Sequence, residues 1–422
     1  MSPVLYDLTH LSHRAEIGAP SGIDRVDLMY ARALSRSPRL AGAVHYGVSR
    51  PSLLEASELA AVVARAENRW RGQASSDPGL ARLRNFLLGV TQETQQTWAP
   101  RPPLAWRREI VRRARIGRYK LLSRREAPRG AVYLNVAQHA LERRTHFRWL
   151  ADRPDVKPAF FLHDLLPLDY PEFWPAGHEE MFERRVATLF ELARAILVSS
   201  ETVAERLRAE LRRRGRDPAL FVWPLPSPLQ ANPGADEEDA ELAAAPYFVV
   251  LGAIEPRKNH LALLNIWRAM IEAGERPPKL VVVGGRGWLN AETCAALDRA
   301  RALEGYVVEA AGLGDAALRR LLRNARALLA PSFAEGYGLP LVEALGLGVP
   351  VLASDLPIFR EVSRGCAILL GATDGAAWRE AVRALADKGS APARQARARA
   401  AGYRGPDAGA YFEALEAFLQ SL

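Results

Sequence analysis

Cysteine is almost missing from this sequence, and its scarcity excludes two ways of building a fold. The 422 residues include only Cys294 and Cys366, which cannot form a disulfide framework or a cysteine-based zinc cluster. Both lie in patterns typical of packed helix and strand, so we expect them to be buried as small hydrophobic residues. The chain must therefore fold around ordinary apolar cores.

Long apolar runs are missing as well. No stretch approaches the ~20 apolar residues that span a bilayer. Residues 1–14 also lack the basic-then-apolar order of a signal peptide. We therefore expect the protein to remain in the cytoplasm.

What the sequence does have is the composition of a globular protein, with 49% apolar and 25% charged residues. Single cores stop growing at roughly 250–300 residues. A chain of 422 residues therefore predicts two domains of similar size.

Positive charge is concentrated in one segment of the chain. Residues 101–130 contain eleven basic and two acidic side chains, and the remainder is balanced. Because residues from about 50 to 128 lack strand-helix alternation, we interpret them as a basic helical insertion in the first domain. Two roles stay open for the segment: a solvated helix face packed on its own domain, or a surface that docks on an anionic membrane. A nucleic-acid site ranks last, because the segment has few aromatic residues, Trp106 and Tyr119.

Short β-branched runs alternate with helical patterns through the second half, which predicts a parallel, doubly wound α/β sheet. The predicted strands lie within residues 247–254, 279–285, 306–312, 327–332, 349–354 and 366–370. The first half shows the alternation less clearly, at 131–136, 158–164 and 195–200, with Ser200 or Thr202 as the cap of the next helix. Residues 223–246 have the Pro-, Gly- and acid-rich composition of an exposed linker, so we place the domains at 1–226 and 227–404.

Glycines and carboxylates gather in residues 331–354, between two predicted strands. Gly336 and Gly338 let the backbone approach a ligand or take positive φ, which places Glu335 in a loop and Glu343 in the first turn of a helix. The amides of such a helix terminus form an anion site suited to a diphosphate. Glu335 can then accept hydrogen bonds from sugar hydroxyls and Glu343 from a ribose. The alternative is a tight strand-helix turn with a favourable glutamate at the start of the helix.

Arg257 and Lys258 follow the first predicted strand of the second half. Ligands bind at the carboxyl ends of strands in open α/β sheets, and this pair of cations suits a diphosphate. A solvated turn is the alternative interpretation.

Two further candidates lie in the first half. His163 and Asp164 end a predicted strand, where the carboxylate can orient the imidazole or raise its pKa and the imidazole can contact a sugar. Alternatively, Asp164 caps a turn and His163 is merely partly buried. Gly22 opens a predicted helix at 21–34, and its loop is a weak candidate for a phosphate contact.

Together, residues 252–260 and 318–362 and the His163–Asp164 pair resemble the retaining glycosyltransferases of family 4, which have the GT-B fold. The resemblance is strong over about 245–372 and rests on short segments in the first half. It implies two facing, doubly wound Rossmann-like domains separated by a cleft. The first would bind the acceptor and the second the nucleotide-sugar donor, and a C-terminal helix at about 405–422 would pack back on the first.

The resemblance also implies roles for individual residues. Arg257 and Lys258 would bind the donor diphosphate and stabilise the leaving group, and His163 would lie near the reacting sugar. Glu335 would hold sugar hydroxyls and Glu343 the nucleotide ribose. Backbone amides would meet sugar or phosphate at Gly336, Tyr337, Gly338 and Leu339. Gly22 would stand where the family places a glycine-rich phosphate loop, although this sequence has one glycine there.

The reaction implied by the resemblance is transfer of a hexose with retention at the anomeric carbon. GDP-mannose or a related deoxysugar donor is favoured, followed by UDP-hexoses. A saccharide or lipid-linked saccharide would be the acceptor, as in assembly of bacterial surface polysaccharide such as lipopolysaccharide. We expect no cofactor, and no metal because the sequence lacks an Asp-x-Asp pair. The alternative is a nucleotide-sugar epimerase, which shares the two-domain layout.

Overall fold

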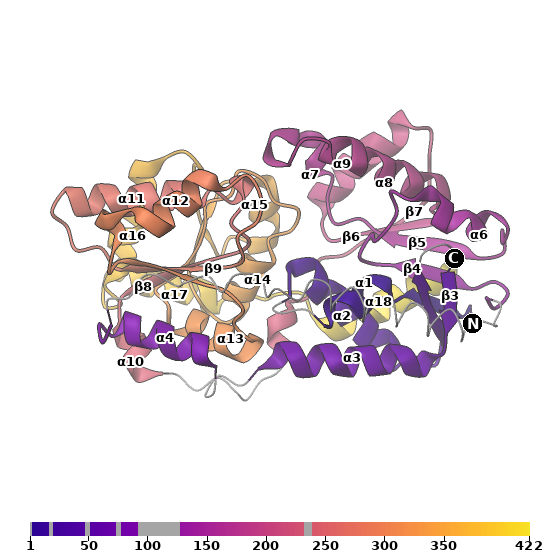
Figure 1. Cartoon of the computed structure of the whole chain (residues 1–422), viewed down its shortest axis with the longest axis horizontal. Helices are drawn as coiled ribbons and strands as arrows, with labels where there is room; N and C mark the ends of the chain where they lie inside the picture. Colours follow the sequence, from indigo (N-terminus) through magenta and orange to yellow (C-terminus); the bar gives the residue numbers. More distant parts are fainter. Residues whose placement is uncertain (1, 17–19, 47–50, 73–76, 92–126, 232–238) are drawn as a thin grey trace.

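The computed structural model describes residues 2–16, 20–46, 51–72, 77–91, 127–231 and 239–422. Two α/β domains lie next to each other, each built on a central sheet with helices packed against it (Figure 1). The predicted doubly wound α/β architecture is confirmed, because both sheets are parallel apart from one edge strand. None of the described helices is long and apolar enough to cross a membrane.

The first sheet has seven strands in the order β3-β2-β1-β4-β5-β6-β7, and only the β2–β3 pair is antiparallel. Its strands are β1 (Val4–Asp7), β2 (Leu40–Tyr46), β3 (Pro51–Leu54), β4 (Val132–Asn135), β5 (Lys157–Phe161), β6 (Ala195–Val198) and β7 (Ala219–Val222). The helices of this part of the chain are α1 (Thr9–Arg14), α2 (Gly22–Leu34), α3 (Ala56–Arg71), α4 (Pro78–Leu87), α6 (Arg148–Ala151), α7 (Leu166–Asp169), α8 (His178–Leu192) and α9 (Glu201–Arg213), with 3-10 turns η2 (Arg144–Phe147) and η3 (Pro171–Phe173). Ser200 caps α9 by accepting the Val203 amide at 3.1 Å.

The second sheet has six parallel strands in the order β10-β9-β8-β11-β12-β13. They are β8 (Tyr247–Leu251), β9 (Lys279–Val283), β10 (Val307–Ala310), β11 (Leu328–Ala330), β12 (Val351–Ser354) and β13 (Ile368–Leu370), all within the predicted ranges. The helices are α10 (Ala240–Ala244), α11 (His260–Glu272), α12 (Ala291–Arg299), α13 (Asp315–Asn324), α14 (Leu339–Gly346), α15 (Pro357–Ser363), α16 (Gly375–Ala386) and α17 (Ala391–Ala401), with 3-10 turns η5 (Pro256–Lys258) and η6 (Arg301–Leu303).

The predicted helical insertion begins later than residue 50. Residues 51–54 form β3, which approaches β2 so closely that a Cβ at Gly42 would lie 2.5 Å from the Leu54 carbonyl oxygen. Helices α3 and α4 follow, as predicted. Nearly all of the basic segment 101–130 lies outside the described residues.

Helix α4 comes from the first half of the sequence but packs on the second sheet, against β10 and α13 (Figure 1). Lys279 at the start of β9 donates to the Phe86 carbonyl, and its ammonium lies 4.4 Å from the centre of the Phe86 ring. Asp77, which caps α4, accepts the Gly314 amide at 3.2 Å. The predicted boundary near residue 226 therefore separates the two sheets, whereas their covering helices are exchanged.

The segment predicted as an exposed linker is partly buried. Leu225 and Leu229 are 2% and 3% exposed, because they join an apolar core that contains residues of both domains. The Tyr337 hydroxyl donates to the Leu225 carbonyl at 2.8 Å, and Arg319 donates to the Leu229 carbonyl at 2.8 Å. The composition was misleading because polar and proline residues alternate here with buried leucines.

The two cysteines are also less buried than predicted, since both thiols are free and partly exposed. Cys294 lies on α12, in which no residue is buried. Cys366 lies in the short turn between α15 and β13.

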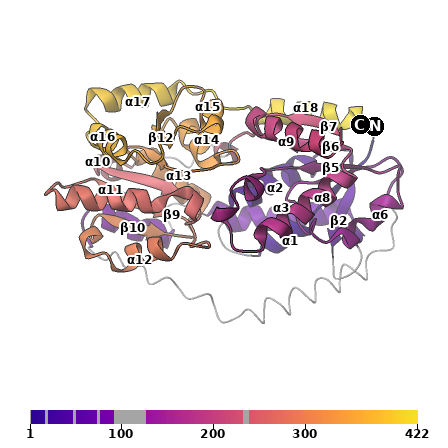
Figure 2. The same ribbon diagram turned by 90° about the horizontal axis from the view of Figure 1, so that it is seen from above.

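The C-terminal helix α18 (Ala408–Ser421) returns to the first domain, as the resemblance implies (Figure 2). Arg39 Nη1 lies 2.5 Å from Glu416 Oε2, and Ser37 donates to Glu416 Oε1 at 2.9 Å. The hydroxyls of Tyr30 and Tyr411 are hydrogen bonded within the core. The last helix thus ties the second domain to the first.

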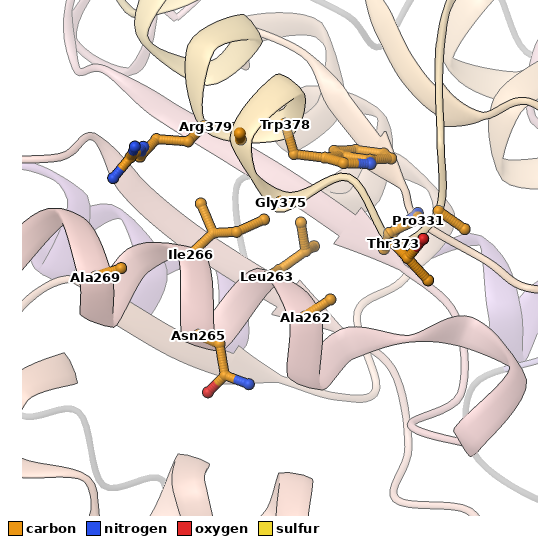
Figure 3. Close-up of a pocket in the computed structure, with 12 residues that line it drawn as sticks. Ala262, Leu263, Asn265, Ile266, Ala269, Pro331, Thr373, Gly375, Trp378 and Arg379 are labelled. Carbon is orange, nitrogen blue, oxygen red and sulfur yellow. The ribbon is translucent and has the colours of Figure 1, made fainter.

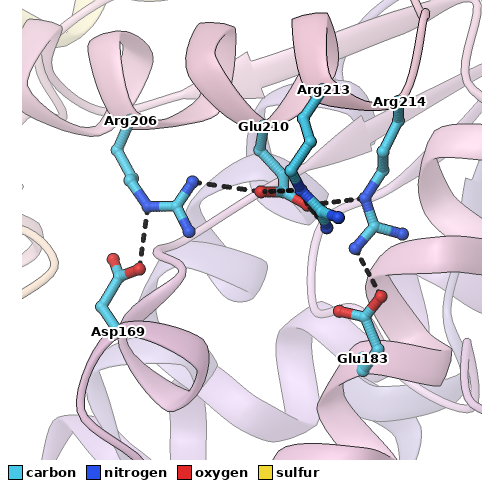
Figure 4. Close-up of polar contacts among 6 residues, drawn as sticks. All are labelled: Asp169, Glu183, Arg206, Glu210, Arg213 and Arg214. Carbon is cyan, nitrogen blue, oxygen red and sulfur yellow. Dashed lines mark hydrogen bonds and ion pairs between the residues drawn. The ribbon is translucent and has the colours of Figure 1, made fainter.

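An ionic network fixes the helices beside the carboxyl end of β5 (Figure 4). Arg206 of α9 donates to Asp169 of α7 at 2.8 Å, and Arg214, the residue after α9, pairs with Glu183 of α8 at 2.5 Å. Glu210 accepts from Arg206, Arg213 and Arg214, and these hydrogen bonds, that of Arg213 foremost, lower the pKa of Glu210 to about 2. Helix α7, which directly follows the His163–Asp164 pair, is therefore held in place.

Candidate active site

Three charged residues meet at the carboxyl edge of the second sheet. Arg257 and Lys258 follow β8 in η5, and Glu335 follows β11, which pairs with β8. Arg257 Nη1 lies 3.1 Å from Glu335 Oε2, and the Lys258 ammonium donates to Oε1. Neighbouring strands thus bring together residues that are 77 positions apart in the sequence.

Burial makes this cluster electrostatically strong. Burial opposes ionisation of Glu335, but the charges of Lys258 and Arg257 lower its pKa to about 2. Burial lowers the pKa of Lys258, although Glu335 opposes the shift. The ion pairs of Glu335 with Arg257 and Lys258 therefore have little water to screen them.

Two residues of the cluster were missed by the sequence reasoning. Glu255 Oε2 lies 3.3 Å from Arg257 Nε, and burial, only partly offset by Arg257, raises the pKa of Glu255. Ser332 donates to Glu335 Oε1 at 2.8 Å. The signal for Glu255 was present, since a buried arginine needs a carboxylate nearby and Glu255 is two residues away.

Asn259 and His260 were also missed. Asn259 has a left-handed φ of 56° and donates to the carbonyls of Pro331 and Ala372, both at 3.1 Å. It thereby fastens the Arg257–Lys258 turn to the ends of β11 and β13. His260 is 2% exposed, and burial lowers its pKa to about 3, so it is neutral.

Asp164 from the first domain reaches this cluster. A Cβ at Gly336 would lie 2.5 Å from Asp164 Oδ2, so only glycine fits against it. Asp164 Oδ1 also accepts the Leu166 amide at 3.1 Å, which is the turn cap of the alternative interpretation. Burial raises the pKa of Asp164, and the charge of Arg257 opposes that shift.

His163 is positioned differently from the prediction that Asp164 would orient it. Its Nε2 lies 2.9 Å from the Val136 carbonyl oxygen, and its ring packs on Phe161. Because the carbonyl can only accept, Nε2 carries the proton and Nδ1 the lone pair. Burial lowers the pKa of His163 to about 4, so the ring is neutral. The sequence had suggested a raised pKa for this residue.

The glycine-rich loop leads into α14 as expected. Gly338 has a φ of 90°, and a Cβ there would lie 2.5 Å from the Phe359 ring. The helix begins at Leu339, and the side chain of Tyr337 is buried on the interdomain segment. Glu343 lies in the second turn, which corrects its predicted place in the first.

The Glu343 carboxyl is nearly enclosed. Glu343 is 2% exposed, and its Oε1 has no hydrogen-bond partner in the described part of the chain. Burial raises the pKa of Glu343 to about 7. A buried carboxyl oxygen without a partner is costly in a protein that has no use for it.

Gly22 is the first residue of α2, as predicted, and its helix start faces the second domain. Ser21 and Asp24 form a capping box there. A Cβ at Gly22 would lie 3.4 Å from Leu339 Cδ1. The start of α2 therefore lies against the start of α14.

A separate pocket of about 430 Å³ opens between α11 and α16 (Figure 3). Leu263 and Ile266 from α11 face Trp378 from α16, and Arg379 lies at one end. Pro331 at the opposite end accepts from Asn259. The pocket lies beside the charged cluster and is not part of it.

The protein has two α/β domains, and charged groups lie at the carboxyl edge of the second sheet. This arrangement is the GT-B fold. Sucrose-phosphate synthase from Thermosynechococcus elongatus matches with a TM-score of 0.59 and 16% identity, over 100% of both chains. At that identity the similarity shows the fold alone.

Residues 245–388 match the family model described as glycosyl transferases group 1. The serotype-specific mannosyltransferase WbdA of Escherichia coli is 31% identical over 49% of this chain and 27% of its own length. The O-antigen chain mannosyltransferase B of E. coli is 30% identical over 47% of this chain and 53% of its own length. The chain thus spans about half or less of these relatives.

Proposed function

We propose that this chain is a retaining hexosyltransferase that moves mannose or a related sugar from a nucleotide-sugar donor to a saccharide or lipid-linked saccharide acceptor. The process would be assembly of bacterial surface polysaccharide. The observation that carries the proposal is the buried cluster of Arg257, Lys258 and Glu335. The family match and the names of the mannosyltransferase relatives support it.

The cluster suits the departure of a diphosphate. Without a donor, Glu335 pairs with both cations. A donor diphosphate would take over Arg257 and Lys258 and leave Glu335 to accept hydrogen bonds from sugar hydroxyls. The cations would then face the charge that develops as the bond between the anomeric carbon and the phosphate oxygen breaks.

The proposed acceptor side, in the first domain, places an uncharged imidazole near the cluster. His163 presents an uncharged ring, and Asp164 is directed at the glycine-rich loop. In the proposed reaction the acceptor oxygen bonds to the anomeric carbon, and its proton passes to the departing phosphate oxygen. No metal is needed in this scheme, because Arg257 and Lys258 supply the positive charge.

A thermal-shift panel tests the donor. GDP-mannose, UDP-glucose, GDP and UDP are compared at equal concentration, since a ligand stabilises the protein according to its saturation. We expect the guanosine ligands to give the largest shifts. Absence of a shift with every nucleotide would contradict the proposal.

A product assay tests the reaction class. Incubation with donor and a mannose-terminated oligosaccharide should give an α-linked product by NMR, unchanged by EDTA. Donor alone should remain intact, whereas a sugar isomer formed without acceptor would indicate an epimerase.

Flotation with anionic and neutral vesicles tests whether residues 101–130 bring the protein to a membrane.

A further inference from the structure

A residue in the first turn of α2 forms an ion pair with the second domain. Arg25 lies one turn after Gly22, and its Nη1 lies 2.6 Å from Oδ1 of Asp315, the first residue of α13. The Arg25 side chain is 11% exposed and that of Asp315 is 31% exposed. The pair thus joins the first domain to the second in a poorly solvated place.

Glu343 lies near this pair, because Gly22, one turn before Arg25, approaches Leu339, one turn before Glu343. Burial sets its raised pKa, and the charge of Arg25 lowers that pKa while the charge of Asp315 raises it further. Burial likewise raises the pKa of Asp315, opposed by Arg25. Two carboxyls of the second domain therefore depend on one guanidinium of the first.

Several other charged side chains on the elements around α14 have partners of their own. On α15, Arg360 pairs with Asp355, and Glu361 accepts the Glu201 and Thr202 amides at the start of α9. On α17, Arg397 donates to a backbone carbonyl. Arg319 of α13 donates to the Leu229 carbonyl and acts on Asp315.

We propose that Arg25 is a positioning residue that keeps Glu343 ionised as a hydrogen-bond acceptor for the donor ribose, and that Asp315 acts in the opposite sense. The inference rests on the proposed function. An ionised carboxylate accepts two hydroxyl hydrogen bonds, whereas the protonated acid must donate one of its own. Because Arg25 belongs to the other domain, a ribose site of full strength forms only when the domains are together.

The charge balance predicts opposite effects for two variants. Arg25→Gln leaves Glu343 and Asp315 facing each other, so Glu343 protonates more readily. Asp315→Asn removes the like charge and keeps a polar partner for Arg25. Loss of packing alone would weaken binding in both variants without moving their pH profiles apart.

The test is the affinity for GDP-mannose between pH 5.5 and 9, measured by calorimetry. This probe is chosen because its diphosphate is esterified at both ends and does not titrate in that range. For the unmodified protein we expect affinity to rise through about pH 7 as Glu343 ionises. Arg25→Gln should move the rise to higher pH and weaken binding about tenfold at pH 7, and Asp315→Asn should move it to lower pH.

Two controls separate charge from folding. Arg25→Lys keeps the charge and should retain most of the normal profile. Arg32→Gln, on the same helix but paired with Glu67, should leave the profile unchanged. Profiles that coincide, or that shift in the same direction in Arg25→Gln and Asp315→Asn, would overturn the inference. Failure of the unmodified protein to bind any nucleotide sugar would overturn the proposed function instead.

Discussion

The two sheets carry different chemistry at their carboxyl edges. In the second domain the edge is strongly ionic, with Arg257, Lys258 and Glu335 in contact. In the first domain the edge is rich in histidines, and the rings of His10 and His13 both lie 6.0 Å from that of His139. The first edge thus combines several histidines with the ion pair of His10 and Asp24, whereas the second brings two cations onto one carboxylate.

Electrostatics explain why the first edge is less charged. Burial lowers the pKa of His139 to about 4, and the positive charges of His10 and nearby arginines act in the same direction. Burial raises the pKa of Asp7, which accepts hydrogen bonds from Tyr133 and Asn135, both at 2.6 Å. Desolvation thus opposes the charged forms of His139 and Asp7 in the first domain, whereas close ion pairs preserve charge in the second.

The largest expected effect is loss of the ionic edge. Arg257→Ala or Glu335→Ala should lower transfer by about 10²–10³-fold, since each removes a preorganised charge from the reaction centre. Exposed Arg276→Ala and Glu272→Gln in the same domain are matched controls that should keep full activity. Near-normal turnover in Arg257→Ala and Glu335→Ala, measured by donor consumption with acceptor, would refute the site assignment.

The next effect tests the contact between the two edges. Gly336→Ala should reduce transfer by about 10–100-fold, because its Cβ would lie 2.5 Å from Asp164 Oδ2 and force the domains apart. Adding Asp164→Gly makes room, because it also removes the Asp164 Cβ that would lie 2.9 Å from the new methyl group, and it should recover part of the loss. Gly285→Ala is the control, since a Cβ there meets nothing within 4 Å. A double variant no better than Gly336→Ala would show that the clash is not what limits activity.

A smaller effect concerns stability and pH. The pKa of Glu343 is raised to about 7 by burial, so ionisation of Glu343 destabilises the nucleotide-free fold as pH rises through that value. Glu343→Gln cannot ionise and should gain roughly 1–3 kcal/mol of unfolding free energy at pH 8 and little at pH 4.5. Urea unfolding at both pH values measures the difference, and an equal gain at pH 4.5 would contradict the assigned cause. Donor affinity should fall in the same variant.

The smallest effect concerns the tie made by α18. Glu416→Gln weakens the ion pair with Arg39, whose side chain is 4% exposed. It should cost about 1 kcal/mol, because Arg39 still donates to the carbonyls of Ser2 and Glu416. Thermal unfolding measures the loss, and Glu413→Gln on the same helix is the control. A drop far larger than this would mean that the two domains unfold as one unit through α18.

The second half was readable because its elements are locally determined. All six strands are short, mostly apolar runs, and Arg257, Lys258 and Glu335 lie in the loops that follow two of them. Adjacent strands in a parallel sheet bring such residues together without any further information. In the first half β2 contains Gly42, β3 is a four-residue edge strand and β7 is half exposed, so their patterns were too weak to predict.

The sequence by itself determined the α/β class and the strands of the second domain, and it singled out Arg257, Lys258, Glu335 and Glu343 as residues of the proposed site. These follow from local patterns and from the chemistry of side chains at strand ends. Tertiary structure alone decided the exchange of α4, the burial of Leu225 and Leu229, and the contacts of Asp164 with Gly336 and of Arg25 with Asp315. Those contacts depend on how two separately folded surfaces meet, and no local pattern encodes that meeting.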